Sequence, residues 1–166
     1  LGLFDAIIGR RVLMYLPDAS QTLARLVTLA KPAAVFAFQE HSRANLPSGL
    51  GSLPCHNQLY RWVWDTVAAE GGDVGLGMRL RSLIQSTGCQ IEDARNEGVL
   101  LHHDEASFLP TLMRGMLPRM IEHRIVKAGE IKEDEFAQEL EKERFSAGGS
   151  IVWDMAFLVS GRLDAG

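Results

Sequence analysis

The sequence predicts an α/β fold in which helices cover a sheet that contains parallel strands. Residues 4–9, 19–30 and 33–38 follow one another as strand, helix and strand, which is a βαβ unit. The second strand is apolar at every position, as is typical of a parallel strand buried on both faces. Amphipathic helices and a last extended segment at 150–159 occupy most of the remaining chain of 166 residues.

A capping residue and a proline predict where the first helix begins and ends. Asp18 is suited to be its N-cap, and Gln21 stands three residues later, as in a capping box. Pro32 is expected to end the helix and to separate it from the strand at 33–38.

Four further helices are predicted at 54–69, 75–87, 107–127 and 131–145, with an extended segment at 90–103. The helix at 107–127 carries a methionine series that we expect in the core, and Pro118 inside it should bend or break it. The charged residues from Glu130 to Arg144 indicate a solvated helix face with internal ion pairs, rather than a binding patch.

Composition excludes several functional classes. Lys and Arg number 17 against 21 Asp and Glu, so a net charge of −4 disfavours general nucleic-acid binding. The longest apolar run is too short to span a membrane. Cys55 and Cys89 stand singly, which favours a cytoplasmic location. Adjacent strand residues face opposite sides, so His102 and His103 should not share an ion, and no metal site is predicted.

Several short sequence motifs resemble those of a known protein family. Residues 4–18 read FDAIIGRRVLMYLPD and resemble the fourth strand and following turn of class I S-adenosylmethionine-dependent methyltransferases. Residues 24–40 resemble the family's next helix and fifth strand, with KPAA where K/R-P-G-G is usual, a departure expected only to change a tight turn. Residues 75–88 are similar to the helix before the sixth strand of the small-molecule type, and 151–159 to the antiparallel seventh strand.

The resemblance implies the rear, C-terminal portion of such a domain. The family's glycine-rich first loop and its ribose-binding acid would lie upstream of Leu1. The chain would then be one partial domain over 1–166, with a core at 1–43, 73–104 and 146–166 and a helical cover, or lid, at 44–72 and 105–145. The family order makes strands four, five, seven and six neighbours. It leaves an open apolar edge at residues 4–8, so we expect a homo-oligomer or pairing with the missing N-terminal half.

The expected function is methyl transfer from S-adenosylmethionine to a small-molecule acceptor. Ligands of such sheets bind beyond the carboxyl ends of the strands, which places the candidates at 9–15 and 39–43. The resemblance assigns cofactor contacts to the first segment: Gly9, Arg10, Arg11, Val12 and Tyr15. Acceptor contacts are expected from Gln39, Glu40, Arg43 and Trp62. Alignment of the reactants supplies most of the catalysis, and His41 is the candidate for an optional general base.

Other interpretations remain open. His41 is equally a polar residue at a strand exit, Arg10 or Arg11 could form a surface salt bridge, and Trp62 could simply pack. The chain could also be a truncated or degenerate half-domain that acts as a binding or assembly module. A nicotinamide-dependent oxidoreductase shares the α/β pattern, but the antiparallel last strand and the Leu-Pro-Asp turn disfavour it.

Overall fold

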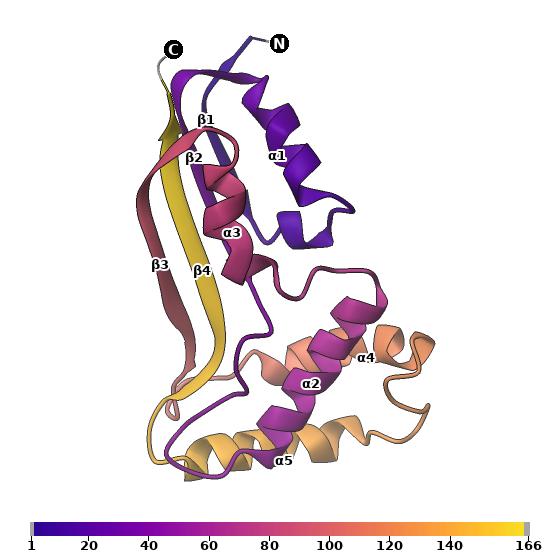
Figure 1. Cartoon of the computed structure of the whole chain (residues 1–166). Helices are drawn as coiled ribbons and strands as arrows, with labels where there is room; N and C mark the ends of the chain where they lie inside the picture. The colour runs from indigo at the N-terminus through magenta and orange to yellow at the C-terminus, as the bar shows by residue number, and fades with distance from the viewer. Residues whose placement is uncertain (1, 165–166) are drawn as a thin grey trace. The chain divides into compact units, whose positions relative to one another are not determined.

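A computed structural model describes residues 2–164 and gives a mixed α/β fold (Figure 1). Its elements are β1 (Phe4–Arg10), a 3-10 helix η1 (Leu13–Tyr15), α1 (Ala19–Val27), β2 (Ala30–His41), α2 (Pro54–Ala69), α3 (Leu76–Gln85), β3 (Cys89–Leu101), α4 (Leu109–Glu122), α5 (Glu133–Ser146) and β4 (Ile151–Leu163). The predicted fold class is confirmed.

The four strands form one sheet in the order β1-β2-β4-β3. β1 and β2 are parallel, and β4 runs antiparallel to β2. This is the order expected from the resemblance, with β1 at an edge of the sheet. No helix among residues 2–164 is long and apolar enough to span a membrane.

Contacts divide the chain into two compact units. Residues 1–44, 71–97 and 155–166 form the first, and residues 45–70 and 98–154 form the second. In the first unit, α1 and α3 lie beside the sheet on the same side (Figure 1). Ala34, Phe36 and Phe38 of β2 are buried, whereas Val35 and Ala37 are only half-buried. The expectation of a strand buried on both faces is therefore met on one face only, because the described helices of this unit cover a single face.

The junction between α1 and β2 differs from the prediction. The helix ends at Val27, and β2 begins at Ala30 and runs through Pro32. Ala33 has a φ of 60°, and the pairing register jumps from Phe4 opposite Ala30 to Ala6 opposite Val35. Such a bulge accommodates a proline, which has no N–H to donate to the ladder. The left-handed backbone at Ala33 also explains why the resembled family has glycine there.

The first helix starts as its sequence predicts. The Asp18 carboxylate accepts a hydrogen bond from the Gln21 N–H at 2.8 Å, so Asp18 is the N-cap of α1. In the core of this unit, η1, α1 and α3 contribute fully buried side chains: Leu13, Met14, Leu23, Leu80 and Ile84.

The second unit contains α2, α4 and α5, which pack on one another. α2 spans the predicted range, and its apolar face is buried at Leu59, Tyr60, Trp64 and Val67. The methionine series of α4 is buried, as expected: Met113, Met116 and Met120. The helix ends at Glu122, earlier than predicted, and it continues through Pro118. Pro118 is exposed, so water can solvate the carbonyl group left without an N–H partner.

Candidate functional site

The carboxyl ends of β1 and β2 lie side by side. Gly9 is opposite Phe38, and Arg10 is opposite Gln39. The backbone N–H of Arg11 donates to the carbonyl oxygen of Gln39 at 2.8 Å, which continues the pairing one residue beyond β1. The two segments that the sequence placed at one edge of the sheet are therefore brought together.

Glu40 fixes the loop that follows β1. Its side chain is fully buried, and Oε1 accepts backbone N–H groups of Val12 at 3.0 Å and Leu13 at 2.8 Å. These donors lie at the start of η1, so a carboxylate from β2 caps a helix that follows β1. The other oxygen, Oε2, is buried with no hydrogen-bond partner among residues 2–164. Glu40, predicted to contact the acceptor, thus positions the candidate cofactor loop with half of its carboxylate.

The predicted cofactor residues differ in their surroundings. A Cβ atom at Gly9 would lie 2.5 Å from Cδ1 and Cε1 of Phe38, so the ring of Phe38 requires a glycine there. Arg11 has a φ of 51°, a left-handed conformation that turns the chain sharply away from the strand. Tyr15 ends η1 and is 46% exposed. Packing of Phe38 accounts for Gly9 without any ligand, and the cofactor role of these residues stays a prediction.

A hollow of about 340 Å³ lies over the strand ends within the first unit. It brings together Gly9, Arg10 and Gln39 of the predicted site residues. The other lining residues are Ile8, Ala37, Phe38, Asp93, Arg95, Leu158, Val159 and Ser160. The guanidinium group of Arg95 is paired with Asp93 and Glu97, whereas Arg10 brings a positive charge to the rim beside an apolar floor. The hollow therefore suits a ligand with an apolar part and an anionic group.

The last residue of β2 and the two residues that follow it contact the start of α3 and the loop before it. His41 is 5% exposed, and a Cβ atom at Gly77 would lie 2.9 Å from its backbone carbonyl group. Ser42 Oγ accepts the N–H of Met78 at 3.1 Å, and the N–H of Arg43 donates to the Val74 carbonyl oxygen at 2.8 Å. Sequence reasoning missed this packing, for which the small Gly77 is the available sign. A general base must reach a substrate proton, and the burial of His41 limits that reach.

A half-buried carboxylate, also missed by the sequence, lies in the other unit. Glu143 Oε1 accepts the Cys55 N–H at 2.7 Å, and Oε2 accepts the N–H of His56 at 3.1 Å and pairs with its Nδ1 at 2.8 Å. Burial acts to raise the pKa of Glu143, but the hydrogen bonds from Cys55 and His56 outweigh it and lower that pKa. Burial, with Glu143 nearby, raises the pKa of the Cys55 thiol to about 11, so this thiol is a poor nucleophile.

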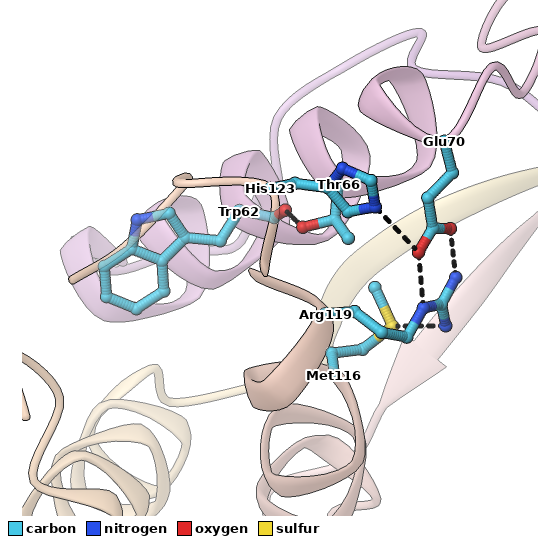
Figure 2. A network of polar contacts seen from close by, with 6 residues as sticks. All are labelled: Trp62, Thr66, Glu70, Met116, Arg119 and His123. Atoms are coloured by element: carbon cyan, nitrogen blue, oxygen red, sulfur yellow. Dashed lines mark hydrogen bonds and ion pairs between the residues drawn. The ribbon is translucent and has the colours of Figure 1, made fainter. Parts of the chain in front are cut away.

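At the C-terminal end of α2, the carboxylate of Glu70 binds side chains of α4 and of the residue that follows it (Figure 2). Arg119 Nε donates to Glu70 Oε1 at 2.6 Å, its Nη2 pairs with Oε2, and His123 Nε2 lies 3.7 Å from Oε1. The Arg119 contact lowers the pKa of Glu70. Met116 Sδ accepts from Arg119 Nη1 at 3.2 Å, which completes a structural clamp between the two helices.

Trp62 belongs to the second unit and lines a different hollow, together with Phe136. The structure therefore does not bring Trp62 into the hollow formed by Arg10 and Gln39. No group of three or more His, Cys, Asp or Glu residues among residues 2–164 could hold a metal ion. His102, one of the metal candidates weighed in the sequence, has its Nδ1 2.8 Å from Ser150 Oγ.

Comparison with known proteins gives a likeness of fold. No protein family model and no curated protein sequence matches the chain. A Bacillus halodurans C-125 protein, provisionally assigned as a methyltransferase, is 8% identical with a TM-score of 0.50, and the match covers 97% of this chain and 70% of that one. Phosphoethanolamine N-methyltransferase 2 of Haemonchus contortus, solved with S-adenosyl-L-methionine, is 13% identical with a TM-score of 0.46 over 97% of this chain and 34% of its own.

The [4+2]-cyclase SpnF is 14% identical with a TM-score of 0.45, over 99% of this chain and 52% of its own. The chain thus spans only about half of SpnF and a third of the Haemonchus enzyme. The likeness to the Bacillus halodurans protein shows that the fold of this chain resembles part of a methyltransferase fold.

Proposed function

We propose that the chain is the rear portion of a small-molecule methyltransferase domain that uses S-adenosylmethionine, and that it acts with a segment completing the sheet at β1. The observation that carries the proposal is the pair of parallel strand ends joined by Glu40, in a sheet of order β1-β2-β4-β3. This order is the one expected for the rear strands of that family.

Two charged residues near the strand ends, on opposite faces of the sheet, support the proposal. The buried Glu40 carboxylate, with Oε2 unpartnered, makes the strand ends electrostatically favourable for a cationic group. Arg10, at the rim of the hollow, could pair with a carboxylate. The resemblance assigns the contact with the ribose to an acidic residue that would lie upstream of Leu1.

When bound, S-adenosylmethionine supplies a methyl group on a sulfonium sulfur, which is already a strong electrophile. The work left to the protein is to align the acceptor's nucleophilic atom and to exclude water. The methyl group would pass from the sulfur to the acceptor's nucleophilic atom, S-adenosylhomocysteine would be the second product, and a proton lost by the acceptor would go to water. A buried strand end with an apolar hollow suits this task, and no dedicated base is needed for an acceptor that is nucleophilic when neutral.

Calorimetry can test this proposal on protein made from the complete reading frame that contains these residues. S-Adenosylmethionine and S-adenosylhomocysteine should bind, and NAD should not. Arg10→Ala should weaken binding of the donor by roughly three- to tenfold, because a charge-assisted hydrogen bond contributes about 1 kcal/mol or more. Lys31→Ala is the control, since Lys31 pairs with Asp5 on the exposed surface. Binding of NAD, or of neither ligand, would overturn the proposal.

An assembly module is the second candidate function, and the edge strand favours it. Ile8 is 76% exposed and Phe4 is 44% exposed on β1, which has unpaired backbone groups along its free edge. A second copy of the chain or the rest of the domain could add a strand there. Light scattering of the purified chain should then show a dimer or larger species that Ile8→Lys dissociates. A monodisperse monomer that binds the donor normally would contradict this candidate.

A further inference from the structure

We infer that the second unit contains a binding site for an organic cation, formed where Trp62 of α2 meets the start of α5. A hollow of about 530 Å³ opens there. Its lining consists of Trp62, Ile131 and Phe136, which are half-buried, and Glu130, Lys132, Glu135, Gln138 and Glu139, which are exposed. This size lies in the range of small-molecule sites, and the whole lining belongs to one unit.

Two aromatic rings are part of the lining of the hollow. The ring centroids of Trp62 and Phe136 are 5.3 Å apart, with the ring planes at 43°. Trp62 lies near the middle of α2 and off its buried face, and its side chain points away from Glu70 (Figure 2). Indole presents the most favourable aromatic face for a cation in a protein. The half-buried rings therefore offer both apolar contact and a negative surface.

The charges around the hollow select the sign of the ligand. Three carboxylates line it. Lys132 Nζ lies 3.1 Å from Glu135 Oε1, and Lys142 Nζ, outside the lining, lies 3.5 Å from Glu139 Oε1, so the rim keeps a negative balance of charge. Glu130 Oε2 accepts the backbone N–H of Lys127 at 2.7 Å, which fixes that carboxylate without neutralising it. An anionic ligand would be repelled, whereas a cation gains from both the rim and the rings. The occupant we infer is an ammonium or quaternary ammonium group attached to a small apolar body.

This site revises the sequence-based view of the charged segment. The expected ion pairs along α5 are present, with Lys132 beside Glu135 and Lys142 beside Glu139. Two of those carboxylates nevertheless share a hollow with an aromatic pair that involves α2, far away in sequence. The face is solvated and, in our inference, also binds a ligand.

A matched set of probes tests the inference on the full chain: choline, its neutral isostere 3,3-dimethyl-1-butanol, and the anion 3,3-dimethylbutyrate. The indole N–H signals of the three tryptophans can be followed by NMR during titration. Choline should shift one signal, which Trp62→Phe removes, and should bind more tightly than the alcohol. Equal binding of choline and the alcohol, tighter binding of the anion, or no binding of any probe would overturn the inference.

Variants separate a site from a structural role. Trp62→Ala should weaken choline binding by roughly three- to thirtyfold, and Trp62→Phe by less, because a ring face remains. Glu135→Gln combined with Glu139→Gln should weaken choline but leave the alcohol unchanged. Glu122→Gln, a charge change on the exposed surface of α4, is the control. An unchanged affinity in Trp62→Ala, with helical circular dichroism preserved, would refute the site. Loss of S-adenosylmethionine binding would leave this result unaffected, so the two proposals fail separately.

Discussion

In each unit the carboxylate of one glutamate accepts hydrogen bonds from the N–H groups at the start of a helix, and the two carboxylates differ in how many hydrogen-bond partners they have. Glu143 belongs to α5, and its carboxylate accepts the N–H groups of Cys55 and His56 at the start of α2. Both of its oxygens have partners. Glu40 belongs to β2, and its Oε1 alone accepts the N–H groups of Val12 and Leu13 at the start of η1. Its Oε2 is buried without a hydrogen-bond partner among the described residues. A fully paired carboxylate is typical of structural support, whereas a half-paired one costs stability. The difference predicts a larger loss of stability at Glu143 than at Glu40 when each carboxylate is replaced by an amide.

Glu143→Gln gives the largest expected effect. The substitution removes the charge and places an amide NH₂ group against the N–H donors of Cys55 or His56, so about 3 kcal/mol of unfolding free energy should be lost. Urea denaturation followed by circular dichroism measures it. Lys142→Gln is the control, because the Lys142–Glu139 pair is exposed and should contribute under about 0.5 kcal/mol. A loss below 1 kcal/mol for Glu143→Gln would show that the cap is not structural.

Glu40 should respond differently to the same change. Glu40→Gln keeps one oxygen for Val12 and Leu13 and removes a buried charge that is only half paired, so the loss should be about 1 kcal/mol or less. Glu40→Ala leaves both N–H groups without this acceptor and should cost about 2–3 kcal/mol. If Glu40→Gln proved as damaging as Glu143→Gln, the contrast between the two carboxylates would be lost.

The acid dependence of stability should come from the carboxylates of the second unit. The pKa values of Glu143 and Glu70 are lowered in the folded chain, so the unfolded chain binds more protons in the acid range. The unfolding free energy should therefore be fully present above the ordinary value of 4.5 and should fall as the pH drops through the lower folded pKa. Glu143→Gln should flatten this dependence in denaturation series at successive pH values. An unchanged slope in that variant would assign the effect to other groups.

Local patterns predicted local structure well, and they failed for partners distant in sequence. The apolar face of α2 and the cap at Asp18 follow from spacing within a few residues, and both are present. The strand order followed from the family resemblance. Neither glutamate cap was predictable, because Glu40 lies 27–28 residues from its donors and Glu143 lies 87–88 from its own. Many glutamates could have served, and only the tertiary fold selects which one meets the free N–H groups.

One left-handed backbone position in each unit allows the same kind of substitution to be compared between the units, with the smallest expected effect on stability. Ala33 in the β2 bulge has a φ of 60°, and Arg124 just after α4 has a φ of 59°. A residue with a Cβ atom loses about 1 kcal/mol or more of folding free energy in this conformation. Glycine avoids that strain, but it loses more backbone entropy on folding, which reduces the net gain. Ala33→Gly and Arg124→Gly should each stabilise the protein by up to about 1 kcal/mol in denaturant midpoints.

The two variants should differ in one respect if the units have different roles. Arg124 occupies the position after a helix end where glycine is commonest, and its backbone N–H donates to the Ile121 carbonyl oxygen at 3.0 Å, so the gain there should be a stability effect alone. Ala33 lies at the start of the strand that carries Gln39 and Glu40. If the bulge is independent of the strand ends, Ala33→Gly should raise stability and leave the affinity for the donor unchanged. A change in affinity with Ala33→Gly, absent with Arg124→Gly, would show that the register of β2 positions the candidate site.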